Sequence, residues 1–166
     1  MHKKPIVLIG PMGVGKTTLG KKLARRLELP FLDTDQILVN KHGPISEIFQ
    51  QLGEPEFRKL EELAVAEALK DLTVVSTGGG AVLSEVTQQL LSKATVIYLE
   101  TDGRHINSRL GKGNRPLLKN GFEDWKRIYD ERRPIYEKLA NITVNTSRQG
   151  LKASIDEICE RLTANE

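Results

Sequence analysis

The stretch Gly10-Pro11-Met12-Gly13-Val14-Gly15-Lys16-Thr17 comes directly after the apolar run Pro5-Ile6-Val7-Leu8-Ile9. Glycine, four free positions and then Gly-Lys-Thr form the pattern of a phosphate-binding loop. Its glycines let consecutive backbone N–H groups turn inward around a polyphosphate, and a helix beginning near Lys16 points the positive end of its dipole at the same anion. The sequence therefore predicts Lys16 at the terminal phosphates and the Thr17 hydroxyl on a magnesium ion. An ordinary glycine-rich turn is the alternative, but the order of strand, loop and amphipathic helix favours the phosphate site.

Outward from this loop, short apolar runs alternate with helical patterns along the whole chain. The predicted strands are Ile6–Ile9, Phe31–Asp33, Thr73–Ser76, Val96–Leu99 and Ile142–Asn145. The predicted helices are Lys16–Leu27, Asp35–His42, Ser46–Leu52, Glu54–Lys70, Ser84–Ser92, Gly103–Leu110, Phe122–Leu139 and Leu151–Leu162. Such alternation is typical of an α/β protein with a parallel sheet covered on both faces. Because ligands of these sheets bind beyond the carboxyl ends of the strands, we expect the chemistry to follow each strand.

The composition fits one domain that covers residues 1–166. The chain is 39% apolar and 28% charged, which is typical of a globular protein with a single core. No apolar run approaches the length of a membrane span, and the N-terminus leads into a strand without a signal-peptide pattern. Cys159 is the one cysteine, which excludes an internal disulfide and favours a cytoplasmic location.

The charge balance is mildly basic, with a net charge of +3 and a pI near 9.0. Nucleic-acid binding is one interpretation. However, the basic residues are interleaved with acids, and Lys21, Lys22, Arg25 and Arg26 fit a solvated helix face. We therefore expect no nucleic acid and no membrane as partners, and anionic small molecules as ligands.

Two carboxylates, Asp33 and Asp35, follow the second predicted strand. Side chains two residues apart at a strand end point in different directions, so the pair is suited to two tasks. One carboxylate would hold magnesium through water, and the other would accept a proton from an attacking hydroxyl. The alternative is that either aspartate caps the helix that follows.

Three glycines, Gly78, Gly79 and Gly80, follow the third predicted strand. Without side chains, they allow a ligand to approach the backbone closely. Arg58 and Arg132 stand on separate predicted helices. Arginine grips carboxylates through two parallel hydrogen bonds, so two arginines at one place would indicate an acceptor that carries a carboxylate. Whether they meet cannot be read from the helical periodicity.

One glycine-rich, basic segment interrupts the regular alternation, from Gly111 through Gly121. A segment of this composition between two helices is either a lid or a surface loop. Arg115 favours the lid, placed at about residues 111–122, because phosphoryl transfer gains from a cation that arrives as water leaves.

Taken together, the motifs resemble the shikimate kinase family over nearly the whole chain. The shared motifs are Gly-Pro-Met-Gly-Val-Gly-Lys-Thr-Thr, Leu-Asp-Thr-Asp, Gly-Glu-Pro-Glu-Phe-Arg, Thr-Gly-Gly-Gly-Ala-Val, Arg-Pro-Leu-Leu and Arg-Arg-Pro-Ile-Tyr. The resemblance implies a P-loop NTPase fold of the nucleoside-monophosphate-kinase type, with a five-stranded parallel sheet in the order 2-3-1-4-5. It also implies a monomer that transfers the ATP γ-phosphoryl group to the 3-hydroxyl of shikimate, with Mg²⁺ as cofactor, on the route to chorismate and the aromatic amino acids.

The resemblance further implies a role for each matching residue. The implied ATP-binding set is Gly13, Val14, Gly15, Lys16, Thr17, Thr18, Arg109 and Arg115, with Arg148 or Gln149 at the adenine. Asp35, Arg58, Gly79 and Arg132 match the shikimate-binding positions, and Thr17 and Asp33 match those at the metal. Lys16, Asp35 and Arg115 match the catalytic positions, and Glu61 could orient Arg58 from one turn further along its helix.

Two departures from the family pattern affect the adenine side. The segment from Arg109 to Arg115 is one residue shorter than in other members, and Gln149 stands where some members carry an arginine. Alignment of the preceding strand favours Gln149 over Arg148. Rival interpretations are a related small-molecule kinase, such as a gluconate kinase, and a nucleotide-binding module without turnover; the acceptor residues argue against both.

Overall fold

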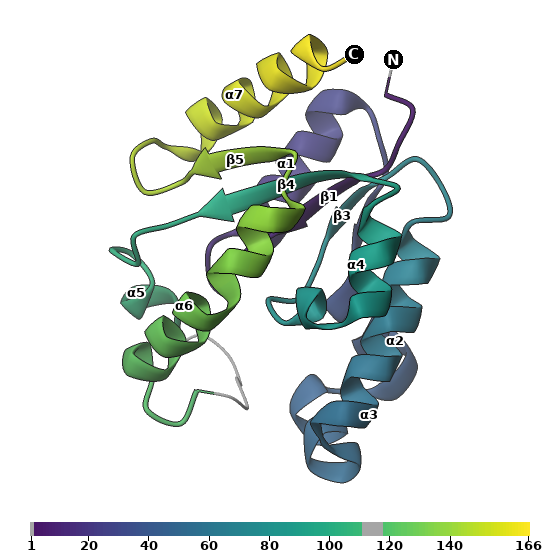
Figure 1. Cartoon of the computed structure of the whole chain (residues 1–166), viewed down its shortest axis with the longest axis vertical. Coiled ribbons are helices and arrows are strands. Elements are labelled where there is room, and N and C mark those ends of the chain that lie inside the picture. The colour runs from purple at the N-terminus through teal and green to yellow at the C-terminus, as the bar shows by residue number, and fades with distance from the viewer. Residues whose placement is uncertain (1, 111–117) are drawn as a thin grey trace.

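A parallel sheet forms the centre of the protein, whose computed structural model describes residues 2–110 and 118–166 (Figure 1). Its five strands are β1 (Ile6–Ile9), β2 (Phe31–Asp33), β3 (Val74–Ser76), β4 (Thr95–Glu100) and β5 (Ile142–Asn145). The strand order is β2-β3-β1-β4-β5, as the resemblance implied. In β1, Ile6 pairs with Val74 of β3 on one side and with Thr95 of β4 on the other.

Helices lie on both faces of this sheet. They are α1 (Lys16–Leu27), α2 (Thr34–His42), α3 (Ile45–Ala68), α4 (Glu85–Leu91), α5 (Asn107–Leu110), α6 (Phe122–Leu139) and α7 (Leu151–Ala164), and η1 (Ala81–Leu83) is a short 3-10 helix. Figure 1 shows α7 above the sheet and α6 and α4 below it. The element types and most of their bounds agree with the prediction.

The two faces of the sheet carry separate hydrophobic cores, because side chains alternate along a strand. Ile6 and Leu8 of β1 point to one face and pack with side chains of α1 and α7. Val7 and Ile9 point to the opposite face and pack with aromatic side chains of α6. All four side chains are buried, which explains why β1 is a continuous apolar run. Buried on both faces, this strand gives the loop that follows it a fixed starting point.

A third cluster joins α2 and α3 through Leu38, Ile48 and Phe57. Within α3, Gly53 has φ 79° and ψ 169°, so the helical conformation is interrupted there. This is the break predicted between the helices Ser46–Leu52 and Glu54–Lys70. The part of α3 after this break carries Arg58, whose guanidinium lies against Gly80.

The predicted helix Gly103–Leu110 is wrong over its first half, because only Asn107–Leu110 is helical. Gly103 has φ +84°, and its N–H donates to the Thr101 hydroxyl instead of continuing a helix. The next residue, Arg104, donates its N–H to the Asp102 carboxylate. These local side-chain bonds form a turn and delay the helix.

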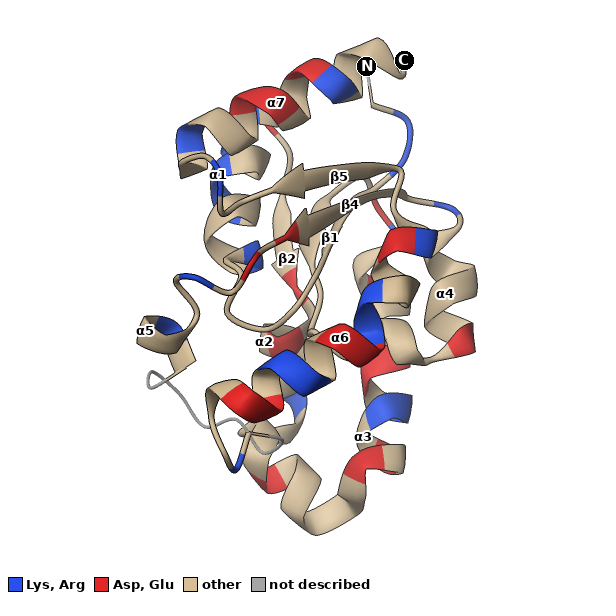
Figure 2. Ribbon diagram, turned by 60° about the vertical axis from the view of Figure 1, so that its left-hand side comes forward, with Lys and Arg blue, Asp and Glu red and all other residues tan. Residues whose placement is uncertain are grey.

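Charged residues of both signs are mixed along the surface helices. Figure 2 shows Lys or Arg alternating with Asp or Glu along α6 and α7. Such mixed charges are typical of solvent-exposed helix faces. Within residues 2–110 and 118–166, every helix is too short or too polar to cross a membrane.

Candidate active site

The phosphate loop lies between β1 and α1, where the sequence predicted it. Gly13 and Gly15 have φ values of +79° and +105°, a backbone conformation that favours glycine. The α1 helix begins at Lys16. Lys16 is 7% exposed as a residue, and its ammonium group donates to the carbonyl oxygens of Gly10 and Pro11 at 2.7 and 2.8 Å. Lys16 is thus folded back over its own loop, with its charge at the mouth of the anion site.

Asp33 connects this loop to the second strand through both of its carboxylate oxygens. Its Oδ2 accepts a 2.7 Å hydrogen bond from the Thr17 hydroxyl. Its Oδ1 accepts from the N–H groups of Asp35 and Gln36, at 2.9 and 3.3 Å, and so caps α2. The alternative of a helix cap is therefore confirmed for Asp33, and its role at a metal stays a prediction.

The phosphate loop, the aspartate pair and the glycine turn surround one hollow of about 330 Å³. Its lining includes Met12, Gly13, Gly15, Lys16, Thr17, Thr18, Asp33, Asp35, Ser76, Thr77, Gly78, Gly79 and Arg109. The ends of β1, β2 and β3 all contribute to it, as the rule for parallel sheets predicts. A polyphosphate held by the loop would therefore have its end beside Asp35.

The three glycines after β3 leave room for four charged side chains. A Cβ atom at Gly78 would lie 2.9 Å from both Asp35 Oδ1 and Glu61 Oε2. At Gly79 it would lie 3.7 Å from Arg132 Nη1, and at Gly80 only 2.4 Å from Arg58 Nη2. The turn is therefore in contact with Asp35 and with both arginines. Arg58 of α3 and Arg132 of α6, whose meeting the sequence could not show, therefore flank the same turn.

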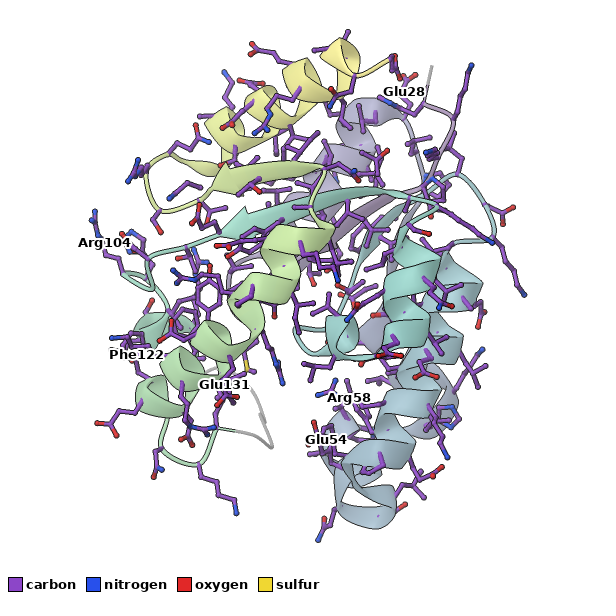
Figure 3. The ribbon with its side chains drawn as sticks, viewed as in Figure 1. Glu28, Glu54, Arg58, Arg104, Phe122 and Glu131 are labelled. Atoms are coloured by element: carbon purple, nitrogen blue, oxygen red, sulfur yellow. The ribbon has the colours of Figure 1, made fainter. Side chains whose placement is uncertain are left out.

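Arg58 is held on several sides by its own helix. Its Nη1 donates to Glu61 at 2.9 Å and its Nη2 to Glu54 at 3.1 Å, and its guanidinium carbon lies 5.2 Å from the Phe57 ring centre. Figure 3 shows Arg58 and Glu54 on the side of α3 that faces α6, where Glu131 lies. The Nε of Arg58 is buried and has no hydrogen-bond partner within the described ranges.

Glu61 lies among these charges and is 2% exposed. Burial raises its pKa above the ordinary value of 4.5, and the negative charge of Asp35 acts in the same direction. The positive charges of Arg58 and Arg132 act against this rise. The two arginines, Asp35 and Glu61 therefore form one electrostatic cluster, in which Glu61 orients Arg58, as predicted, by accepting a hydrogen bond from its guanidinium.

A second cavity, of about 730 Å³, adjoins the first hollow. Gly15, Thr18 and Arg109 line both cavities, and Arg148 and Gln149 line the second one only. Arg109 Nη1 donates to the Gly13 and Val14 carbonyls at 2.9 and 3.2 Å, while the Gln149 amide donates to Glu157 at 2.6 Å. The size and position of this second cavity suit a nucleoside whose phosphates enter the phosphate loop. Arg115 lies outside the described residues.

Two aromatic residues of α6 were not predicted as parts of the site. The Tyr136 hydroxyl donates to the Gly79 carbonyl, and Trp125 Nε1 donates to the Met12 carbonyl at 2.8 Å. Eleven residues separate them, about three helical turns, so both lie on one face of α6 with Arg132. The spacing of these residues in the sequence indicates that they share a helix face. It does not indicate which backbone carbonyls the two aromatic side chains reach.

The comparisons with known proteins agree with this geometry. A family model described as shikimate kinase matches residues 12–163. A shikimate kinase of Corynebacterium efficiens is 36% identical over 166 residues, 98% of each chain. Another, of Saccharopolyspora erythraea, is 43% identical over 164 residues, 96% of this chain and 94% of the relative.

Solved structures show the same likeness. Shikimate kinase from Acinetobacter baumannii in complex with shikimate superposes with a TM-score of 0.92 at 32% identity, covering 98% of this chain and 94% of that one. Shikimate kinase from Aquifex aeolicus has a TM-score of 0.83 at 34% identity, with 97% of each chain covered.

Proposed function

Because this chain belongs to the shikimate kinase family, we propose that it transfers the γ-phosphoryl group of ATP to the 3-hydroxyl of shikimate, giving shikimate 3-phosphate and ADP. One observation carries the assignment: the phosphate loop and the arginine-flanked glycine turn belong to a single site, with Asp35 between them. A nucleotide-binding module without turnover would not need the acceptor side of this arrangement.

On the nucleotide side, the loop N–H groups and the start of α1 hold the phosphates. Lys16 leaves its contacts with the Gly10 and Pro11 carbonyls and neutralises charge that develops on the transferred group. Thr18 and Arg109 line the passage to the second cavity, where Arg148 or Gln149 contacts the adenine. Arg115 closes on the phosphates; this role stays a prediction from the family resemblance.

Thr17 and Asp33 are suited to hold Mg²⁺. Magnesium takes hard oxygen ligands and usually binds one or two protein groups together with substrate phosphates and water. The Thr17 hydroxyl and the Asp33 carboxylate are already 2.7 Å apart at the phosphate hollow, whereas the described part of the chain contains no group of three or more acidic, His or Cys side chains for a fully protein-bound metal. When bound, the ion neutralises phosphate charge.

On the acceptor side, Arg58 and Arg132 bind the shikimate carboxylate through charge-assisted hydrogen bonds. Gly79, without a side chain, allows the ring to approach the backbone. Asp35, in contact with the same turn, holds the reacting hydroxyl and accepts its proton as the oxygen attacks phosphorus. Positioning and charge neutralisation then provide most of the rate increase.

The test is a coupled assay of ADP formation with three alternative acceptors. Shikimate should support saturable turnover, while gluconate and adenylate should give only the rate of ATP hydrolysis in water. Turnover with gluconate or adenylate but not with shikimate would contradict the proposal. We also propose that the enzyme is a cytoplasmic monomer, which light scattering and cell fractionation would test.

A further inference from the structure

Trp125, the one tryptophan of the chain, makes a contact that the proposed chemistry has not used. It stands in the first turn of α6, is 2% exposed, and its Nε1 donates to the carbonyl oxygen of Met12 at 2.8 Å. Met12 lies in the phosphate loop and lines the hollow beside Lys16. The bond therefore joins the loop to the helix that carries Arg132.

Packing from three sides fixes the orientation of the indole. The Phe122 ring stacks on it with centres 5.5 Å apart, and the Tyr129 ring meets it edge-on at 5.2 Å. On the third side, a Cβ at Gly103 would lie 3.0 Å from the indole. The ring thus has little freedom, and its N–H is directed at the loop carbonyl before any nucleotide arrives.

The Met12 carbonyl is one of five consecutive loop carbonyls that accept side-chain hydrogen bonds. Lys16 donates to the Gly10 and Pro11 carbonyls, Trp125 to that of Met12, and Arg109 to those of Gly13 and Val14. Holding a peptide by its oxygen also fixes the direction of the adjoining N–H groups, because the peptide unit is planar. Lys16 and Arg109 belong to the nucleotide site itself, and Trp125 alone of the three comes from α6.

We propose that Trp125 is a positioning residue for the nucleotide: its N–H fixes the Met12 peptide and so the direction of the loop N–H donors that bind phosphate. The inference rests on the proposed function, because it assumes that the loop binds ATP. It assigns Trp125 no contact with either substrate. A loop with a free Met12 carbonyl would bind nucleotide more weakly, while Arg58 and Arg132 would bind the acceptor as before.

The test compares Trp125→Phe with Phe122→Leu in the full chain. Trp125→Phe keeps an aromatic ring and removes the N–H donor, whereas Phe122→Leu removes the stacking partner and keeps the donor. A second probe replaces Trp125 with 3-benzothienylalanine, in which sulfur stands in place of the N–H at nearly the same shape. The readouts are the Kd for ADP by calorimetry, the KM values for ATP and shikimate, and the Tm.

Loss of one hydrogen bond should raise the Kd for ADP and the KM for ATP by roughly twofold to tenfold. We expect this in Trp125→Phe and in the benzothienyl protein, with the KM for shikimate unchanged, and a smaller loss in Phe122→Leu, which keeps the donor and two of the three packing contacts. Unchanged ADP affinity in the benzothienyl protein, or an equal loss in Phe122→Leu, would overturn the inference. ADP binding is measured without acceptor, so it tests the role of Trp125 alone. Failure of the proposed function would instead appear as a lack of shikimate-dependent turnover in the parent protein.

Discussion

The Thr17 hydroxyl donates a 2.7 Å hydrogen bond to Oδ2 of Asp33, while Oδ1 of the same carboxylate caps α2. One side chain thus serves the metal site and the local fold, and the two roles can be separated by mutation. Asp33→Asn keeps an oxygen for the cap but loses the negative charge, so we expect a higher Mg²⁺ requirement at nearly unchanged stability. Asp33→Ala should in addition lower the free energy of unfolding by about 1 kcal/mol, the usual cost of a lost cap.

The measurements are Mg²⁺ titrations of activity at saturating ATP and denaturant unfolding of each variant. An Asp33→Asn enzyme with the Mg²⁺ dependence of the parent would contradict the metal role. Equal unfolding free energies for the Asn and Ala variants would contradict the capping role.

Substitution of Lys16 should lower the turnover number far more than it changes the fold. Lys16→Met, which retains most of the apolar stem, and Lys16→Ala should each lower kcat by roughly a hundredfold or more, the effect of removing a preorganised charge from a transition state. Steady-state kinetics and circular dichroism check this. Near-normal turnover in a folded Lys16→Ala protein would exclude phosphoryl transfer at this loop.

Arg132 and its neighbour Arg133 provide a matched pair. Arg132 is 7% exposed and flanks Gly79, whereas the Arg133 guanidinium lies 4.6 Å from the Tyr129 ring centre and is partly exposed. Arg132→Ala should raise the KM for shikimate by roughly tenfold to a hundredfold, as expected for a lost hydrogen bond to a charged group, and change the KM for ATP little. Arg133→Ala should change neither. Equal effects of Arg132→Ala on both substrates would mean that the acceptor carboxylate binds elsewhere.

The glycine turn offers a substitution that acts on Arg58 without changing it. In Gly80→Ala the new Cβ would fall 2.4 Å from Arg58 Nη2, so the guanidinium must move, and the KM for shikimate should rise by roughly tenfold through the weakened charged hydrogen bond. Gly150→Ala is the control, because its Cβ would meet nothing within 4 Å. A Gly80→Ala enzyme with unchanged shikimate kinetics would place the acceptor away from Arg58.

Glu61 should make the stability of the protein depend on pH. Its pKa is raised in the folded chain above the ordinary value of 4.5, so the folded state binds more protons than the unfolded state in the range above that value. The free energy of unfolding therefore falls as the pH rises through the folded pKa. Glu61→Gln removes this titrating group, so the Tm of the variant relative to that of the parent should increase as the pH rises above 4.5. A Tm difference that decreases over this range would contradict the raised pKa.

The sequence predicted the nucleotide side of the site more completely than the acceptor side. The phosphate loop is local, so Gly13 to Thr17 could be interpreted from spacing alone, and the bounds of α1 and β1 are as predicted. The meeting of Arg58 with Arg132 depends on how α3 and α6 pack on the sheet, which periodicity does not contain.

Side-chain bonds to the backbone account for the remaining differences. The turn at Thr101 to Arg104 replaces half of a predicted helix because Gly103 adopts a positive φ and nearby oxygens accept its N–H and that of Arg104. The contact of Trp125 with Met12 spans 113 residues. No local sequence pattern encodes such a bond, because it depends on how α6 packs against the phosphate loop.

In the proposed site, the nucleotide and a carboxylate-bearing acceptor bind side by side. The most direct test is the initial rate of ATP-dependent ADP release with shikimate and, in parallel, with its methyl ester, which lacks the negative charge that Arg58 and Arg132 would bind. We predict saturable ADP release with shikimate and a far higher KM for the ester. Equal kinetics with the two compounds, or no ADP release with shikimate above hydrolysis in water, would contradict the account.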